Sequence, residues 1–141
     1  MIALDNHTNL NINLKDLENI AKQLTAQEIE LLVVDDAYIQ SLNKQYRDKD
    51  KSTDVLSFPL DNPFDLEDMP LGSIVIASSF VIGKAQEFGH TQEEECALLF
   101  IHGLLHLLGF DHECDNGEMR SKEKEIIESF DLPQSLIVRT V

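Results

Sequence analysis

The positions of apolar residues along the first part of the chain predict two short strands with a helix between them. Residues 2–6 and 28–34 are short runs rich in apolar and β-branched side chains, a composition that favours strands. Between these runs, leucine, isoleucine and alanine recur at helical spacing over about residues 14–24. This spacing places the apolar side chains on one stripe, as in a helix that packs against a sheet.

A second helix and two further strands are predicted next. Asp35 or Asp36 can cap the helix, since an aspartate side chain accepts hydrogen bonds from the first free amides of a helix. Residues 53–60 read as a strand and residues 72–77 as another, nearly continuous apolar strand. The acidic segment 61–70 between them contains two prolines and is expected to be a surface loop.

The rest of the chain has mainly helical patterns. Ser78 or Ser79 is expected to cap a helix that runs to about Phe88 and ends at Gly89. A later stretch, residues 118–130, is amphipathic and predicts a last helix.

Another helix is predicted to begin at Thr91, because Glu94 three residues later completes a capping box. Strands and helices are mixed without strict alternation along the chain. We therefore expect an α+β fold, a small mixed sheet packed with about five helices, formed as a single domain by residues 1–141.

Charge is distributed unevenly along the chain. The formal net charge is −15, from 26 acidic and 11 basic residues, which argues against broad nonspecific affinity for nucleic acid. However, Lys44, Arg47, Lys49 and Lys51 fall inside eight residues. Such a local positive patch can hold a phosphodiester backbone, although the ordinary role of a charge run is a solvated surface.

The sequence gives no sign of a membrane segment or of a disulfide framework. The most apolar run, residues 97–110, is shorter than the roughly 20 residues that a bilayer requires, and no secretory signal pattern is present. Two cysteines, Cys96 and Cys114, are too few for a disulfide scaffold. We expect a reduced, cytoplasmic protein without membrane contact.

Three of the five histidines occur at the spacing of metal ligands. His102 and His106 stand four residues apart, so a helix places both rings on one face. Gly109 can leave the helix in a left-handed conformation and turn the chain so that His112 reaches the same ion. Three imidazoles predict one Zn²⁺ with an open fourth position, which is the pattern of a catalytic site. A single histidine on an apolar helix would more often be a core residue.

Neighbouring residues leave some details of this site open. Zinc peptidases carry a glutamate general base directly after the first histidine, where this chain has Gly103, so peptide hydrolysis is the weaker hypothesis. Cys114 could be a fourth ligand in a closed structural site. Asp111 could orient a ligand ring or cap the turn after Gly109.

Two separate motifs resemble the bacterial YbeY family of single-strand-specific metallo-endoribonucleases. They are HGLLHLLGFDH at residues 102–112 and LNKQYRDKDKSTDVLSFP at residues 42–59, and the similarity extends over roughly residues 40–130. The resemblance implies a zinc-dependent hydrolase that matures ribosomal RNA, notably the 3′ end of the small-subunit (16S) RNA, and acts in ribosome quality control. Single-stranded ribosomal RNA, the ribosome and targeting proteins are the implied partners.

The same resemblance assigns roles to particular residues. The three histidines, His102, His106 and His112, match the zinc ligands of the family, and Arg47 matches an arginine used near the scissile phosphate. The chain departs from the family at Ser73, where many members have aspartate, and at Phe110, where tyrosine is common. Two other functions remain open, a metalloprotease-like hydrolase with a different base and a non-catalytic ribosome-associated factor stabilised by zinc.

Overall fold

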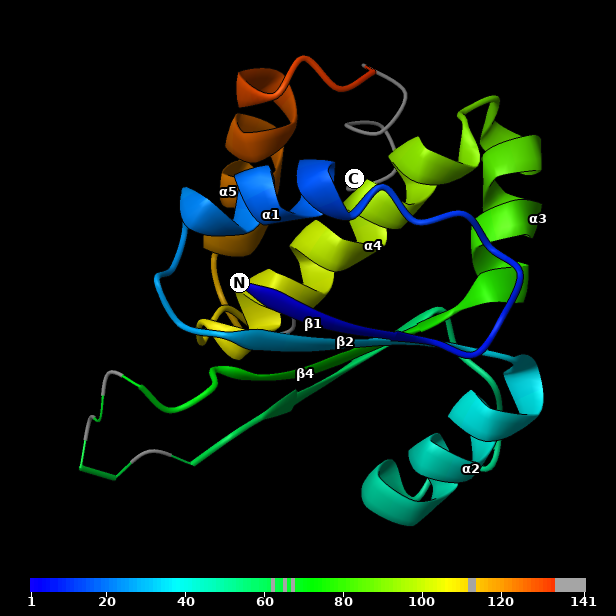
Figure 1. Cartoon of the computed structure of the whole chain (residues 1–141), viewed down its shortest axis with the longest axis horizontal. Coiled ribbons are helices and arrows are strands. Elements are labelled where there is room, and N and C mark those ends of the chain that lie inside the picture. The colour runs from blue at the N-terminus through cyan, green and yellow to red at the C-terminus, as the bar shows by residue number, and fades with distance from the viewer. Residues whose placement is uncertain (62, 65, 67, 112–113, 134–141) are drawn as a thin grey trace.

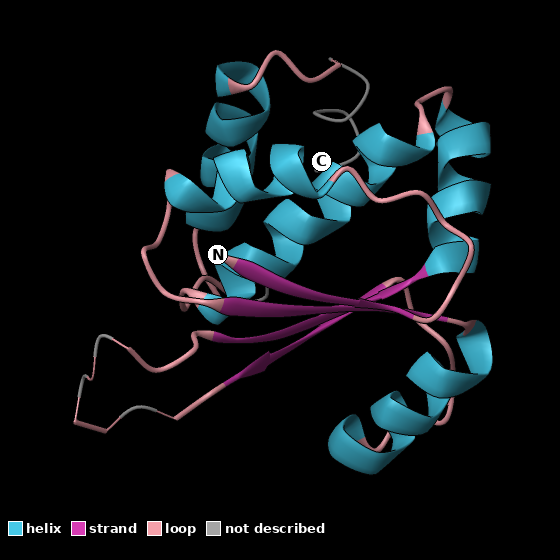
Figure 2. Ribbon diagram, in the orientation of Figure 1, coloured by secondary structure: helices cyan, strands magenta, loops and turns pink. Residues whose placement is uncertain are grey.

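A four-stranded sheet carries four helices on one face and a single helix on the other (Figures 1 and 2). The computed structural model describes residues 1–61, 63–64, 66, 68–111 and 114–133. In chain order the elements are β1 (Ile2–Asn6), α1 (Leu14–Lys22), β2 (Ile29–Val34), α2 (Asp36–Arg47), β3 (Val55–Pro59), β4 (Gly72–Ala77), α3 (Ser78–Phe88), α4 (Gln92–Leu107) and α5 (Glu118–Ser129).

The sheet has the strand order β1-β2-β4-β3. The first three of these strands are parallel, whereas β3 pairs antiparallel with β4 and forms an edge of the sheet. The central strands β2 and β4 are buried almost throughout, because helices cover both of their faces. The predicted α+β fold with a small mixed sheet is therefore confirmed, and five helices occur in the described part of the chain.

Helix α4 lies at the centre of the helical layer. It packs on β3 and β4 and also contacts α1, α3 and α5 (Figure 1). Because neighbours surround it, the helix is apolar on nearly all sides, and Phe100, Ile101, Leu104 and Leu105 are fully buried. On the other face of the sheet, α2 covers a smaller cluster built around Ile39.

Local sequence signals place most helix ends correctly. Asp35 is the N-cap of α2, where its side chain accepts from the Tyr38 amide at 2.9 Å. The expected cap at Ser78 or Ser79 is wrong, since the N-cap position of α3 is Ala77 and no side chain caps this helix. Strand β4 leads directly into α3 at that point, so both serines already lie in the first turn.

No helix among the described residues is both long enough and apolar enough to span a membrane.

Candidate active site

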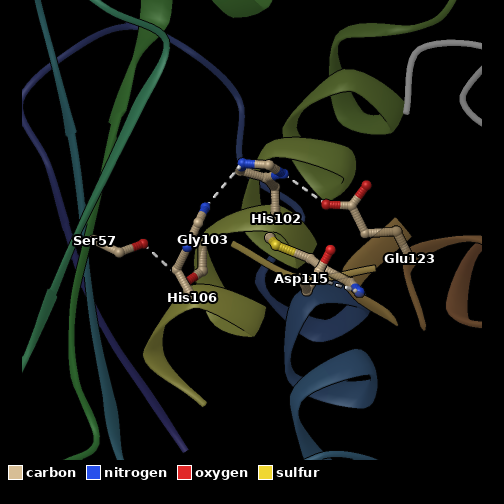
Figure 3. A network of polar contacts seen from close by, with 7 residues as sticks. Ser57, His102, Gly103, His106, Asp115 and Glu123 are labelled. Carbon is tan, nitrogen blue, oxygen red and sulfur yellow. Dashed lines mark hydrogen bonds and ion pairs between the residues drawn. The ribbon is translucent and has the colours of Figure 1, made fainter. Parts of the chain in front are cut away.

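Two imidazole rings lie side by side near the C-terminal end of α4. The helix begins with the predicted capping box of Thr91 and Glu94, and its regular turns place His102 and His106 on one face. Their ring centroids are 4.8 Å apart, and the Nε2 atoms face each other at 3.2 Å (Figure 3). Both residues are half-buried, unlike most of the helix around them.

This pair of nitrogen atoms fits a shared cation. Two lone pairs face each other favourably only when a proton or a metal ion lies between them. Two ligands of a tetrahedral zinc, each about 2.05 Å from the ion, are separated by about 3.3 Å. The observed Nε2 to Nε2 distance of 3.2 Å agrees with that geometry.

A buried carboxylate orients the first ring. Oε1 of Glu123, on α5, lies 2.6 Å from Nδ1 of His102 (Figure 3). Glu123 is only 4% exposed, and an ionised carboxylate acts as an acceptor. Nδ1–H therefore donates to Glu123, and Nε2 of His102 remains available as a ligand atom on the side of His106.

Sequence reasoning assigned Glu123 no role, and gave the ring-orienting role to Asp111 as one of two alternatives. A signal was present, because Glu123 shares an apolar face of α5 with Met119, Ile126 and Ile127. An acidic residue within such a stripe needs a partner, since an isolated buried charge is costly. Its partner is His102, which is 21 residues away along the chain.

The chain leaves α4 through a glycine, as predicted. Gly109 has φ +100°, and its amide donates to the carbonyl of His106 at 3.1 Å. The next amide, of Phe110, donates to the carbonyl of Leu105 at 3.0 Å. These two bonds form a Schellman motif, which reverses the chain just after the histidines. The third predicted ligand, His112, lies outside the described residues.

Close packing fixes the distance between α4 and strand β3. The Ser57 hydroxyl donates to the carbonyl of Gly103 at 2.8 Å (Figure 3). A Cβ atom added at Gly103 would lie 2.8 Å from Cγ2 of Ile74 and 3.3 Å from Cγ2 of Val55. Glycine at this position therefore lets the helix approach the sheet directly beside His102.

A cleft of about 630 Å³ lies beside the two histidines. One part of its lining comes from α4 and the turn after it, namely His102, His106, Gly109, Phe110 and Asp111. Another part comes from β3 and the segment before it, and a third part consists of Arg47, Lys49 and Lys51. Three cationic side chains thus meet two imidazoles in a protein whose net charge is −15.

The basic part of this lining is held by the backbone around the end of α2. Asn43 is 2% exposed, and its side-chain amide donates to the carbonyl of Lys51 at 2.9 Å. The amide of Lys49 donates to the carbonyl of Asn43 at 3.2 Å, after Asp48 ends the helix at φ 57°. These bonds bend the segment back, so that Arg47 and both lysines line the same cleft.

The structure places the predicted site residues as follows. His102, His106 and Arg47 line one cleft, together with Asp111, while Cys114 is exposed. Within the ranges described, no group of three or more histidine, cysteine, aspartate or glutamate side chains is arranged to hold a metal ion. The carbonyl of Asp111 accepts from the amides of Cys114 and Asp115, each at 3.1 Å, in the turn that leads to α5.

The chain is similar to a known protein family along nearly its whole length. The model of the family described as Endoribonuclease YbeY matches residues 3–131. The endoribonuclease YbeY of Aliarcobacter butzleri is 62% identical over 140 residues, which cover 99% of each chain. That of Sulfurovum sp. is 58% identical over 142 residues, covering 99% of this chain and 97% of the relative.

A solved structure is also similar. The solution structure of TM1509 from Thermotoga maritima has 33% sequence identity and a TM-score of 0.61, and the match covers 92% of this chain and 89% of that one. The resemblance found in the two sequence motifs is confirmed by these matches, and the chain belongs to the YbeY endoribonuclease family.

Proposed function

We propose that this protein is an endoribonuclease that uses one zinc ion to cleave single-stranded RNA during ribosomal RNA processing. Membership of the YbeY family supports hydrolysis of RNA phosphodiester bonds. The observation that carries the proposal is the shared cleft, in which His102 and His106 lie with Arg47. Maturation of small-subunit RNA and ribosome quality control, both in the cytoplasm, are the processes in which we place this activity.

The residues for the metal are His102, His106 and His112. The chemistry of this donor set fits zinc, and the 3.2 Å separation of two Nε2 atoms supports a common ion. When bound, such an ion supplies Lewis acidity, which lowers the pKa of water and offsets the charge of a phosphate. Glu123 keeps His102 in the tautomer whose Nε2 can bind the ion, so the His102 ring needs no reorientation before metal binding.

Arg47 would hold the scissile phosphate. Its guanidinium carries planar donors that match two phosphate oxygens, and of the three cations that line the cleft it is the one that lies at the end of a helix rather than in a loop. Lys49 and Lys51 extend the positive lining beyond it and would contact neighbouring phosphates of the strand. Negative charge elsewhere on the protein repels RNA, so productive binding is confined to this cleft.

Zinc analysis combined with cleavage of a labelled single-stranded RNA tests the proposal. We expect about one zinc per chain, cleavage that stops after chelation and returns with zinc, and loss of both zinc and cleavage in His106→Ala. Circular dichroism should show that the chelated protein remains folded. Unfolding on zinc removal, without RNA cleavage by the holoprotein, would instead indicate a structural zinc. Turnover of casein with intact RNA would indicate a peptidase.

A further inference from the structure

We propose that the outer edge of β3 reads an unpaired nucleobase of the bound RNA. The backbone N–H and C=O of Ser57 would form a pair of hydrogen bonds with the Watson–Crick edge of a base lying beside the two histidines. This inference rests on the proposed function, because it concerns how the same cleft holds its substrate. It follows from the hydrogen-bonding pattern of the strand.

The pairing of β3 with β4 fixes which backbone groups point outward. The amide of Ala77 donates to the carbonyl of Asp54 at 2.9 Å, and the amide of Leu60 donates to the carbonyl of Leu71 at 3.1 Å. In an antiparallel ladder, hydrogen-bonded and non-hydrogen-bonded residues alternate along each strand. Residues 54, 56, 58 and 60 therefore bond to β4, and the backbone groups of Val55, Ser57 and Pro59 point away from it.

Two of these three outward positions present no available donor. The amide of Val55 donates to the carboxylate of Asp54 at 2.8 Å. Pro59 has no N–H at all. Along the described strand β3, Ser57 is thus the outward residue that presents both a donor and an acceptor.

This pattern suits a small planar ligand better than another strand. A second polypeptide strand would need a row of donors and acceptors along the edge, and here the capped amide and the proline remove two of the donors. One donor and one acceptor on the same residue suffice for the edge of a nucleobase, which also carries a donor next to an acceptor.

The position of Ser57 links this edge to the site. Its hydroxyl is bonded at 2.8 Å to the carbonyl of Gly103, the residue after His102, and both Ser57 and His102 line the cleft. The cationic side chains that attract phosphates come from a different part of the lining, Arg47, Lys49 and Lys51. An RNA strand with its phosphates on those cations would turn its bases toward the edge of β3.

Pairing of this kind explains a preference for single strands. The Watson–Crick edge of a base is already occupied in a duplex and is exposed only in unpaired RNA. The backbone of Ser57 would therefore select unpaired nucleotides, and this selection would not depend on any particular protein side chain.

A pair of substitutions separates the amide of Ser57 from its hydroxyl. Ser57→Ala loses the bond to Gly103 and keeps the N–H, whereas Ser57→Pro loses both. Proline is compatible with this position because the amide is outside the ladder and the preceding residue is already extended. We expect Ser57→Pro to raise KM for an octauridylate about tenfold over Ser57→Ala, the effect of one lost hydrogen bond, with little change in kcat.

Modified RNA tests the carbonyl half of the pair, in proteins that carry no proline ring. An octauridylate methylated at N3 of every base lacks the donor on its Watson–Crick edge. The wild-type protein and Ser57→Ala should cleave it with a KM about tenfold higher than for the unmodified RNA. Ser57→Pro keeps the carbonyl that accepts from N3–H, so methylation should raise its KM as well.

The outcomes distinguish this inference from the proposed function. Equal KM values for Ser57→Pro and Ser57→Ala, or equal KM values of the wild-type protein for the two RNAs, would overturn the role of the β3 edge while leaving the nuclease assignment intact. Failure of the wild-type zinc-loaded protein to cleave either RNA would overturn the proposed function itself. Urea unfolding of both variants shows whether each remains folded under the assay conditions.

Discussion

The carboxylate of Glu123 lies 2.6 Å from Nδ1 of His102, although the two residues belong to different helices. Helix α5 thereby helps to determine the chemistry of α4, because an Nδ1–H bonded to Glu123 leaves Nε2 as the ligand atom. The contact is largely shielded from water, since the side chain of Glu123 is 5% exposed and that of His102 is 30% exposed.

We expect Glu123→Gln to weaken zinc binding by about 10- to 100-fold. The glutamine oxygen can still accept from Nδ1–H, but it no longer carries the negative charge that makes Nε2 of His102 a stronger metal ligand. Competition with a chromophoric chelator measures the affinity. Glu125→Gln on the same helix is the matched control, since the side chain of Glu125 is 68% exposed. Equal affinities for the two variants would show that Glu123 does not tune the site.

Arg47→Glu should lower RNA cleavage by about 100-fold or more, because it removes preorganised donors from the phosphate and replaces them with a negative charge. Zinc content and thermal unfolding should stay close to those of the parent. Lys44→Glu makes the same change in charge on the same helix, but Lys44 is outside the cleft and lies 3.9 Å from Asp50. Comparable losses of cleavage in both variants would show that Arg47 contributes only through the overall charge of the protein.

Gly103→Ala should destabilise the protein by about 1–3 kcal/mol, because its Cβ would lie within 2.8 Å of Ile74 in a packed interior. Gly83→Ala is the contrasting change, since a Cβ at Gly83 in α3 meets nothing within 4 Å. That substitution should raise the free energy of unfolding by about 0.5–1 kcal/mol through helix propensity. Urea unfolding compares the two, and a similar loss in both would contradict the packing argument.

Cys96 should resist thiol reagents in the folded protein. Burial, with a smaller contribution from the neighbouring carboxylate of Glu95, raises the pKa of its thiol to about 12, so the reactive thiolate is scarce at pH 8. Cys114 is exposed. We expect iodoacetamide at pH 8 to label Cys114 in the native state, and both cysteines in urea. Rapid native labelling of Cys96 would contradict its burial.

The raised pKa of the Cys96 thiol also makes the free energy of unfolding depend on pH. The folded state holds the thiol proton more tightly than the unfolded state does, so this contribution is complete below the ordinary thiol pKa and is lost as pH rises toward about 12. The free energy of unfolding of the parent should fall more steeply above pH 9 than that of Cys96→Ala. Parallel pH profiles would show that the thiol makes no such contribution.

Local signals in the sequence were sufficient for most of the fold. The capping box at Thr91, the N-cap at Asp35 and the glycine that ends α4 depend on residues within one turn of each other, so their pattern is visible in the sequence. The same is true of the two histidines, whose spacing of four residues puts both on one face of any helix.

Features that depend on tertiary packing were harder to predict from the sequence. The contact between Glu123 and His102 requires the angle at which α5 meets α4, which no local pattern encodes. The error at Ser78 has a related cause, because a cap at Ser78 or Ser79 requires that residue to lie outside the helix, whereas β4 passes directly into α3. Likewise, the sequence showed a basic window around Arg47, but only the bond from Asn43 to Lys51 explains why that window lines the cleft.

The glycine beside His102 also separates two kinds of hydrolase. Zinc peptidases place their glutamate base at the corresponding position, but here the first side-chain atom would already collide with Ile74 on β4. A single mutation to glutamate would therefore push the helix off the sheet before it could supply a base. A glutamate at this position would therefore require smaller side chains on the facing strands, at Ile74 and Val55.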